Sequence, residues 1–276
     1  MSTFETESRV FVDDCRLSEQ YRRILKRDET FLLLHGKFHK AWHWKQTADH
    51  LRKAFNYRVE IPDFDVDKSG TTIHDDIGKA LNMVRDHDRV VVVAHSWACE
   101  LAPGIIEGLG ARAVALINLN NAGPKKFLIN DHEKKGRYQK GFEKAIQTDE
   151  NGFNYLPEEA ALQFMFNACE DKKFARRAAG LFRPQRPYED DPDQIINLPL
   201  YLPTVQIQGQ QDKVHNRLWV DDSAREWGHS AKVERLDFDH SPMVSKPQYL
   251  GMVFFARLQT MMGKDLEFSM ENAVEE

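Results

Sequence analysis

The stretch VVVVAHSWACE, residues 90–100, decides the fold and contains the first candidate functional residue. Four consecutive valines favour a strand that is buried on both faces, as strands of a parallel sheet are. Ser96 follows with alanines two positions before and after it, and the apolar segment ELAPGIIEGL (100–109) then has helical character, with Pro103 in its first turn. A serine with small neighbours between a strand and a helix is the pattern of a nucleophile elbow, a tight turn that exposes the hydroxyl.

Five other apolar segments along the chain have the composition of buried strands. They are FLLLH (31–35), YRVEIPDF (57–64), AVALINLN (113–120), TVQIQG (204–209) and KVERLDF (232–238). Amphipathic segments with a helical apolar period lie between them at residues 41–55 and 73–84. This alternation predicts an α/β fold with a doubly wound, mostly parallel sheet. The first thirty residues contain RVFVDD and LSEQYRRIL, for which we expect an antiparallel hairpin at the sheet edge.

The interval from residue 124 to residue 198 breaks this alternation. It has no clear strand, and it is rich in helix-forming and aromatic residues, among them Phe164. We therefore predict a helical cap at 124–198 that is inserted into an α/β core made of residues 1–123 and 199–276. A cap of this length covers the carboxyl ends of the strands, where doubly wound folds bind their ligands.

Composition excludes several classes of function. The 276 residues are 41% hydrophobic with a net charge of −5, which suits one domain with an insertion and argues against a nucleic-acid partner. No apolar run approaches the roughly 20 residues of a membrane span, and the first residues, MSTFETESR, do not have the pattern of a signal peptide. Cys15, Cys99 and Cys169 lack disulfide or zinc spacing, which predicts reduced thiols in a cytoplasmic protein.

The histidines give no sign of a metal centre. No pair has metal-ligand spacing, so neither a metal nor another cofactor is expected. His132, His215 and His229 are isolated in the sequence, and we expect them to be exposed. The expected partner is a small-molecule substrate rather than a membrane, and whether the chain forms a homodimer stays open.

Two later polar residues complete a candidate catalytic set with Ser96. Asp212 follows TVQIQG and His240 follows KVERLDF, so each lies just past the carboxyl end of a predicted strand. A serine needs a base to accept its proton and a carboxylate to orient that base. The chain order serine, aspartate, histidine is the order that elbow enzymes have. In the alternative interpretation, Asp212 caps a helix and His240 lies in a surface loop.

A serine nucleophile also needs donors for the oxyanion that develops during the reaction. The N–H of Trp97, directly after the serine, is one donor. The second is expected from the loop of residues 35–38 after the first central strand, where Gly36 allows close backbone approach. The indole ring of Trp97 has two interpretations, because it either narrows the acyl site or packs in the core under the helix.

Three segments resemble a known family. LLLHGKFHKAWHW (32–44) is similar to the HGxxHxAWxW signature of α/β-hydrolases close to plant methyl-ester esterases, hydroxynitrile lyases and their bacterial esterase relatives. FMFNACEDKKFARRAAGLFRPQRP (164–187) resembles the cap of that group, and DHSPMVSKPQYL (239–250) resembles its segment around the catalytic histidine. The resemblance implies an α/β-hydrolase core with a helical cap. It implies the functional residues Ser96, Asp212 and His240 as catalytic triad, with the N–H groups of Lys37 and Trp97 as oxyanion hole.

Some residues depart from the family pattern. The elbow reads AHSWAC where the group has GHSxGG. The hydroxynitrile lyases of the group carry a threonine and a lysine at two positions where this chain has Gly36 and Ser241. These two residues argue against cyanohydrin cleavage. Gly36, Phe38, His39 and Phe164 are the candidate substrate contacts. For His39 the alternative is that its hydrogen bonds fix the loop, since buried polar groups need partners.

The sequence predicts a serine hydrolase that cleaves a small or medium, largely apolar carboxylic ester through an acyl-enzyme on Ser96. A lactone or an amide is a less favoured substrate. A lyase or a cofactor-independent oxygenase on the same scaffold is the first alternative, because a fold does not fix one function. A ligand receptor that kept the triad without turnover is the second alternative.

Overall fold

A computed structural model gives the structure of the protein. The residues that it describes are 28–120, 138–186, 202–217, 220–221 and 233–263. The hairpin predicted in the first thirty residues falls almost wholly outside the described residues. His132 and His229 also lie outside them.

Six parallel strands form the central sheet, in the order β2-β1-β3-β4-β7-β8. Their bounds are β1 Thr30–Leu34, β2 Arg58–Glu60, β3 Val90–His95, β4 Ala113–Leu119, β7 Thr204–Gly209 and β8 Val233–Leu236. Each predicted strand segment overlaps one of them, and the prediction of a doubly wound parallel sheet is confirmed. The segment 57–64 gives only three strand residues, because Pro62 has no N–H to continue the ladder.

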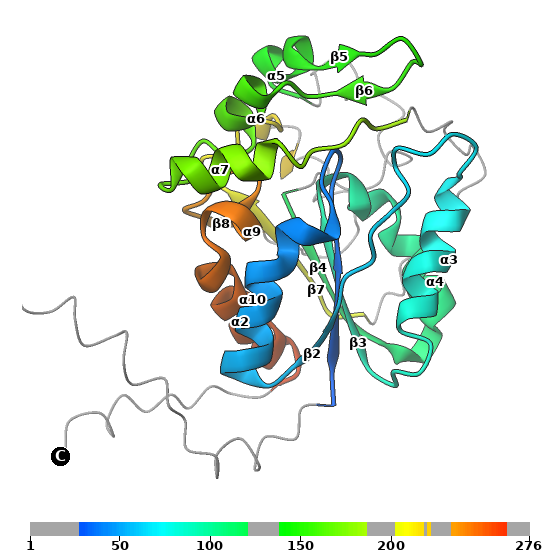
Figure 1. Cartoon of the computed structure of the whole chain (residues 1–276). Coiled ribbons are helices and arrows are strands. Elements are labelled where there is room, and N and C mark those ends of the chain that lie inside the picture. Colours follow the sequence, from blue (N-terminus) through cyan, green and yellow to red (C-terminus); the bar gives the residue numbers. More distant parts are fainter. Residues whose placement is uncertain (1–27, 121–137, 187–201, 218–219, 222–232, 264–276) are drawn as a thin grey trace, which may run out of the picture.

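Helices cover both faces of the sheet (Figure 1). α2 (Lys45–Phe55) and α10 (Pro247–Met261) lie on one face, and α3 (Ile73–Met83) and α4 (Ala102–Leu109) lie on the other. Alternate residues of the central strands β1 and β3 supply the two cores. Phe31, Leu33, Val91 and Val93 belong to one hydrophobic cluster, and Leu32, Leu34, Val92 and Ala94 belong to the other. The continuous apolar runs in the sequence follow from this burial on both sides.

Local signals set the helix bounds next to the site. Thr72 caps α3, because its side chain accepts a hydrogen bond from the Asp75 N–H while the Asp75 carboxylate accepts one from the Thr72 N–H. Pro103 lies in the first turn of α4, where its missing N–H leaves no hydrogen bond unmade. α4 therefore starts a few residues after Ser96, as the sequence predicted.

The described part of residues 124–198 lies over the carboxyl ends of the strands (Figure 1). It contains α5 (Lys140–Ala145), α6 (Glu158–Phe164) and α7 (Lys172–Ala179). It also contains a short antiparallel pair, β5 (Gln147–Thr148) and β6 (Asn154–Tyr155), which the sequence did not reveal. The turn between them forms because the Asp149 carboxylate accepts hydrogen bonds from the N–H groups of Asn151 and Phe153.

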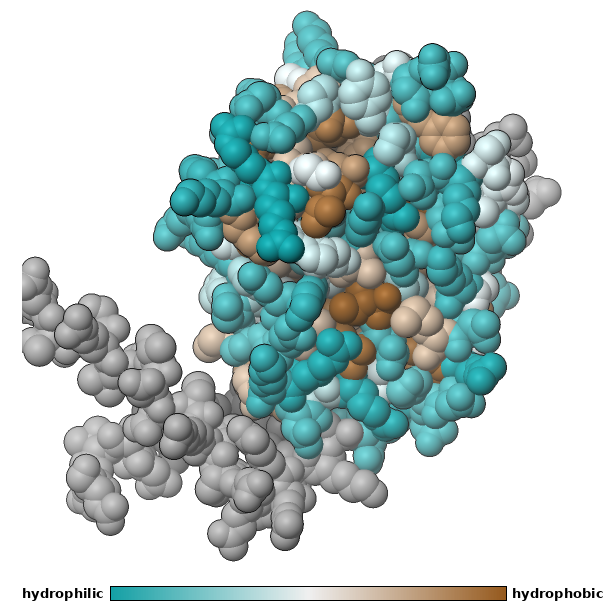
Figure 2. Space-filling view, viewed as in Figure 1, coloured by the Kyte–Doolittle hydropathy of each residue, from teal (hydrophilic) through white to brown (hydrophobic). Residues whose placement is uncertain are grey.

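The face of the molecule seen in Figure 2 is mostly polar. Hydrophilic side chains dominate the view in Figure 2, and apolar residues appear there as separate patches. The exposed large hydrophobic residues of the described chain are Met83, Tyr249 and Met252. Among the described helices, none has both the length and the apolar character that a membrane crossing requires.

Candidate active site

The strand-to-helix turn at Ser96 has the geometry of an elbow. β3 ends at His95, and a 3-10 helix (Ser96–Glu100) leads directly toward α4. Ser96 has a φ of 54°, which few non-glycine residues adopt, so the turn holds the serine in a strained conformation. Ala94 and Ala98 are fully buried beside it. Larger side chains at these two positions would push the strand and the helix apart.

The structure brings Ser96, His240 and Asp212 together in one hydrogen-bonded series. The His240 Nε2 atom lies 3.0 Å from Ser96 Oγ. On the other side of the ring, His240 Nδ1 lies 3.0 Å from Asp212 Oδ2. Because a carboxylate only accepts, the Nδ1–H donates to Asp212 and Nε2 accepts from the serine hydroxyl. All three side chains are buried, which excludes water from competing for these bonds.

Asp212 is fixed in place by the turn after β7. Its Oδ1 accepts hydrogen bonds from the N–H groups of Val214 and His215 at 2.7 and 3.3 Å, and its Oδ2 accepts one from Gln208 Nε2 at 2.5 Å. Burial alone would raise the pKa of Asp212, but His240, His215 and the Val214 N–H outweigh it and lower the pKa to about 2. Asp212 is therefore a carboxylate at neutral pH.

His240 lies in the loop after β8, and two side chains bind its backbone carbonyl. The Asn120 Nδ2 group donates to the carbonyls of Asp239 and His240 at 2.9 and 2.8 Å. His95 Nε2 donates to the same His240 carbonyl at 2.8 Å. Asn120 Oδ1 in turn accepts from the Gly209 N–H at 2.6 Å, which ties β4 to β7 beside the site.

Sequence reasoning missed Asn120. It follows β4 directly, as Ser96, Asp212 and His240 follow their own strands. That placement of a polar residue at the carboxyl end of a central strand was the signal that could have identified it.

The loop after β1 packs directly against Ser96. A Cβ atom on Gly36 would lie 2.8 Å from His95 Nδ1 and 2.9 Å from Ser96 Cβ, so only glycine fits there. His39 Nδ1 donates to the Lys37 carbonyl at 2.7 Å, and the Ser241 hydroxyl donates to His39 Nε2 at 3.0 Å. Both ring nitrogens of His39 are thus used to join this loop to the loop of His240. These contacts favour the alternative interpretation of His39, in which its hydrogen bonds hold the loop in place.

The segment between α6 and α7 clamps the loops of Asp212 and His240. Asn167 Nδ2 donates to the Gln211 carbonyl at 3.1 Å, and the Ala168 N–H donates to Asp239 Oδ2 at 3.0 Å. Burial raises the pKa of Asp239 to about 6, although hydrogen bonds from Ser245, Ala168 and Ser241 lower it in part. This segment begins the stretch 164–187 that resembles the cap of the family.

The remaining candidate residues lie in packed surroundings. Trp97 is 5% exposed, and its ring meets that of Phe64 at 6.1 Å in an edge-to-face contact inside the hydrophobic cluster on the α3–α4 face. This favours the core interpretation of the indole. The Phe164 ring packs edge-to-face on Phe142 at 5.7 Å. Phe38 is buried with a φ of 67°, and Lys37 beside it is half-buried.

Five histidine rings form a continuous series through the site. The successive centroid distances are 4.9 Å for His43–His39, 5.2 Å for His39–His95, 5.0 Å for His95–His240 and 5.1 Å for His240–His215. The expectation that His215 is exposed is wrong, since only 3% of it is accessible. Its neighbours in the chain gave no sign of this burial, because His240 and Tyr138, whose rings pack on it, come from distant segments.

Burial keeps four histidines near the site uncharged. It lowers the pKa of His35 to about 3 and that of His43 to about 4. It lowers the pKa of His39 and of His95 well below the usual range, and neighbouring histidines add to the effect. A hydrogen bond of His35 supports the uncharged state of its ring, because Nε2 accepts from the Phe64 N–H and therefore carries no proton.

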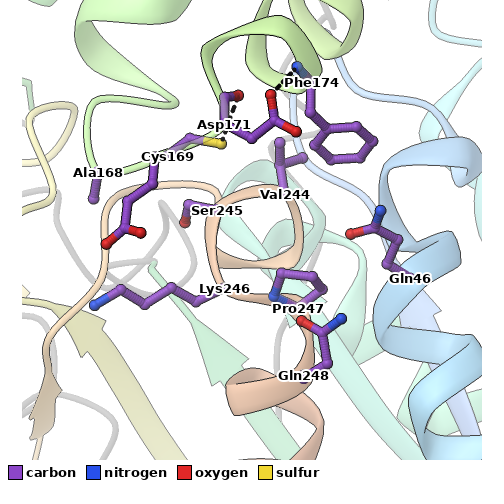
Figure 3. A pocket seen from close by; sticks show the side chains of 11 residues that line it. Gln46, Ala168, Cys169, Asp171, Phe174, Val244, Ser245, Lys246, Pro247 and Gln248 are labelled. Atoms are coloured by element: carbon purple, nitrogen blue, oxygen red, sulfur yellow. Dashed lines mark hydrogen bonds between the residues drawn. The ribbon is translucent and has the colours of Figure 1, made fainter. Parts of the chain in front are cut away.

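A second hollow lies between the cap and the core (Figure 3). It has a volume of about 360 Å³, and its lining includes Gln46 of α2, Cys169, Asp171 and Lys246. The Asp171 carboxylate is occupied there in capping α7, and Cys169 Sγ bonds the Asp171 carbonyl. The lining includes Ser245, whose hydroxyl donates to Asp239 Oδ1 at 2.7 Å, but it includes no histidine that could act as the base, so the series at Ser96 is the stronger candidate for an active site.

Comparisons with known proteins bear on the fold. No protein-family model matches the sequence, and a search of curated proteins finds no match either. The structure is similar to that of a methylesterase from Arabidopsis, with a TM-score of 0.67 and 16% identity over 84% of this chain and 99% of that one. A pyrethroid hydrolase from Sphingobium faniae JZ-2 gives a TM-score of 0.67 and 16% identity over 83% and 96% of the two chains.

Methylketone synthase I from tomato, in complex with 2-tridecanone, is similar to the same degree. Its TM-score is 0.68 at 15% identity, over 84% of this chain and 98% of that one. Identities this low carry information on architecture rather than on substrate. Together with the six-stranded parallel sheet and its helices on both faces, they establish that the chain has the α/β-hydrolase fold.

Proposed function

We propose that the protein is a serine hydrolase that cleaves small or medium, largely apolar carboxylic esters through an acyl-enzyme on Ser96. The observation that carries this proposal is the series Ser96 Oγ, His240, Asp212, with 3.0 Å at each of its two hydrogen bonds. A serine on a strained elbow next to a neutral imidazole and a buried carboxylate is an activated nucleophile.

The contacts of Ser96, His240 and Asp212 support the following roles in the reaction. His240 Nε2 takes the proton of Ser96 Oγ as the oxygen attacks the ester carbonyl carbon. The C–O bond to the alcohol then breaks, and His240 returns the proton to the leaving oxygen. Water repeats the same sequence on the acyl-enzyme and releases the acid. Asp212 holds the ring and stabilises its cationic form, and the N–H groups of Lys37 and Trp97 bind the oxyanion.

The names of two structural neighbours support an ester as the substrate. One is a methylesterase, and another is a hydrolase of pyrethroids. A third neighbour is a methylketone synthase, which is not named as a hydrolase and keeps a lyase as the second candidate function. The hydrolase and the lyase differ in one reaction intermediate, since only the hydrolase forms an acyl-enzyme on Ser96.

Pre-steady-state turnover of p-nitrophenyl acetate tests the proposal. A burst of p-nitrophenol equal to the enzyme concentration is expected, because acylation releases the phenol before water frees the enzyme. A serine-directed phosphonate should abolish both the burst and the steady rate. A protein that binds the ester without releasing phenol is a receptor, and that result contradicts the proposal. Cleavage of a β-keto acid without any burst points to the lyase.

Gly36→Ala tests the loop that faces the nucleophile. The added methyl group would meet His95 Nδ1 and Ser96 Cβ at under 3.0 Å, so the loop must move away from the elbow. We expect kcat/KM for the ester to fall by roughly 10²-fold or more, the cost of misplacing the oxyanion donors by about 1 Å. Gly78→Ala on α3 is the matched control, because its Cβ would meet no atom within 4 Å. Equal rates for both variants would contradict the placement of this loop.

Trp97→Leu tests the position of the indole ring. Because the ring packs on Phe64 in the core, the variant should lose about 2–3 kcal/mol of unfolding free energy. The rates for acetyl and octanoyl esters should change by the same factor, since the backbone N–H is retained. Denaturant unfolding and the acyl-chain profile measure the two effects. A selective gain on octanoyl esters at unchanged stability would place the ring in the acyl site instead.

A further inference from the structure

Asp212, His215 and His240 have side chains that can bind a metal ion, and these side chains lie close together. His215 is the one of the three that the proposed mechanism does not use. Asp212 Oδ2 lies 3.0 Å from His240 Nδ1 and 3.9 Å from His215 Nδ1. One ligand atom from each of the three residues lies within 4.8 Å of the others. Zinc–ligand bonds of about 2.0–2.2 Å place tetrahedral ligands roughly 3.3–3.6 Å apart. The three groups therefore need to move by less than about 1 Å to hold one ion.

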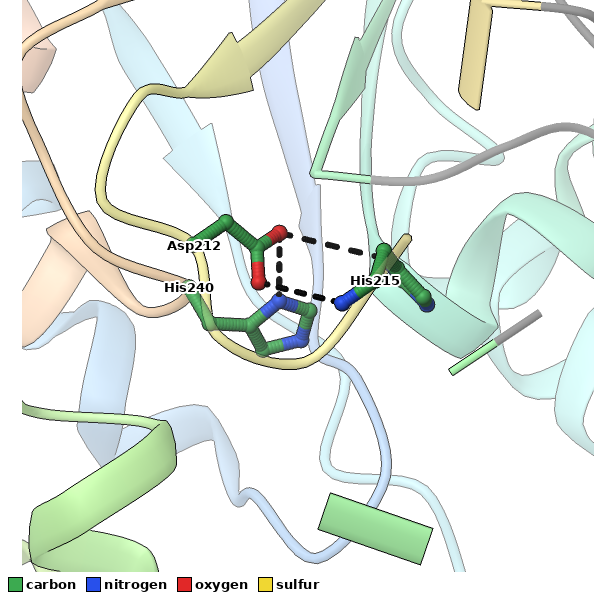
Figure 4. A group of neighbouring side chains, drawn as sticks. All are labelled: Asp212, His215 and His240. Atoms are coloured by element: carbon green, nitrogen blue, oxygen red, sulfur yellow. Dashed lines mark hydrogen bonds and ion pairs between the residues drawn. The ribbon is translucent and has the colours of Figure 1, made fainter. Parts of the chain in front are cut away.

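The chain holds His215 rigidly in this position. It comes three residues after Asp212 in the same turn, and its N–H donates to Asp212 Oδ1 at 3.3 Å. Its ring stacks on Tyr138 with a centroid distance of 5.7 Å and meets the His240 ring edge-on at 5.1 Å. Figure 4 shows the Asp212 carboxylate facing both imidazole rings, with dashed lines that run from it to His240 and to His215. A ligand set that is fixed before the ion arrives requires little ordering when the ion binds.

A cavity gives access to these ligands from outside the catalytic series. It has a volume of about 370 Å³, and its lining contains Asp212 and His215 but not Ser96. Gln139, Gln208 and Arg217 also line its wall, and Arg235 in the same lining forms an ion pair with Asp221, which offsets its charge. Asp212 and His215 thus border a cavity that Ser96 does not line.

We propose that Asp212, His215 and His240 form an inhibitory site for a divalent transition metal ion, and that Zn²⁺ is the ion this donor set fits. Two imidazoles and one carboxylate with room for a water are a zinc ligand set. Ca²⁺ and Mg²⁺ prefer oxygen ligands only and are not expected to bind. The site lies beyond the proposed esterase function, because it describes an ion that stops turnover rather than one that supports it.

The chemistry of inhibition follows from the tautomer of His240. On binding, the ion exchanges three water ligands for Asp212 Oδ2, His215 Nδ1 and His240 Nδ1. The proton on His240 Nδ1 leaves to solvent, and Nε2 takes one up, so the ring stays neutral. With its proton on Nε2, the imidazole cannot accept the proton of Ser96. The Asp212–His240 hydrogen bond is lost in the same step.

Binding is measured first, by calorimetric titration of ZnCl₂ into the Ser96→Ala chain, which lacks the nucleophile and keeps all three ligands. One Zn²⁺ per chain is expected, and Co²⁺ should show the visible absorption of a tetrahedral site. His215→Gln in the same background should weaken Zn²⁺ binding by at least about 10-fold, the lower range for disturbing a metal site. His74→Gln, an exposed histidine on α3, is the matched control and should bind as the parent does. Equal affinity of the His215 and His74 variants overturns the proposal.

The wild-type chain gives a second measurement that does not depend on how a variant folds. Micromolar ZnCl₂ should slow phosphonylation of Ser96, and EDTA should restore the rate. MgCl₂ at the same concentration should have no effect. An unchanged rate at zinc concentrations that saturate the calorimetric site would overturn the inhibitory role. If the chain cleaves no ester, the proposed function fails, yet zinc binding that depends on His215 still supports the metal site.

Discussion

Ser96→Ala is expected to lower kcat for p-nitrophenyl acetate by roughly 10⁶-fold, the loss seen when a catalytic serine is removed from such a series. The oxygen that attacks the ester is absent, while the His240–Asp212 hydrogen bond at 3.0 Å does not depend on it. Alanine is smaller than serine and fits the same turn. We therefore expect the melting temperature to change little.

The control for this variant is Ser69→Ala, which removes an exposed hydroxyl in the loop before α3. It should keep the wild-type rate. A further comparison tests whether the residues act as one unit. His240→Ala should cost about as much as Ser96→Ala, and the double variant should cost no more than either alone. A Ser96→Ala protein that keeps a tenth of the wild-type rate would show that another group attacks the ester.

Acid is expected to destabilise the protein strongly as the pH falls from about 6.5 to about 5, because four histidines must stay neutral in the fold. Burial lowers the pKa of His35 to about 3 and of His43 to about 4, and it lowers those of His39 and His95 well below 6.5. Below the unfolded value of about 6.5, the unfolded chain takes up protons that the folded chain does not. The contribution of the four histidines to the free energy of unfolding is therefore complete above their unfolded pKa. It is lost as the pH falls toward their lower pKa values in the folded chain.

The size of this effect is large. At about pH 5, His35 and His43 each cost about 2 kcal/mol of unfolding free energy relative to neutral pH, and His39 and His95 act in the same direction. Asp239 acts in the opposite direction, since its folded pKa of about 6 lets the folded chain take up one proton first. For His35, His43 and Asp239 together the net loss is about 2–3 kcal/mol, and His39 and His95 add to it.

Urea unfolding at a series of pH values measures the loss, and its slope reports the protons taken up on unfolding. His35→Gln should reduce that uptake by one proton. The exposed His74→Gln should leave it unchanged. Equal stability at about pH 7 and about pH 5 would contradict the burial of these rings in neutral form.

The sequence was sufficient to predict the sheet and the elbow. Four valines at 90–93 form a strand only where both faces are covered, and the same reasoning applies to the strands before Asp212 and His240. Once the strands are parallel and neighbouring, their carboxyl ends meet at one edge of the sheet. The proximity of Ser96, Asp212 and His240 follows from that topology and from the order of the strands.

Other features depend on contacts between distant segments, and no local pattern reveals them. His215 is buried because Tyr138 and His240 pack on its ring, and neither is its neighbour in the sequence. The direction of the Trp97 ring depends on the positive φ of Ser96 and on Phe64 from the loop after β2. The strands β5 and β6 have only two residues each, so the alternating apolar pattern of a strand cannot appear in their sequence.

The most direct test of the central claim is to label the wild-type chain with a fluorophosphonate and map the modified peptide by mass spectrometry. The account predicts one label per chain on the oxygen of Ser96, with loss of ester turnover in proportion to labelling. The label requires an activated serine, so it depends on the contact with His240 at 3.0 Å rather than on the choice of substrate. An active chain that takes up no label, or takes it up at another residue, would contradict the assignment of Ser96 as the nucleophile.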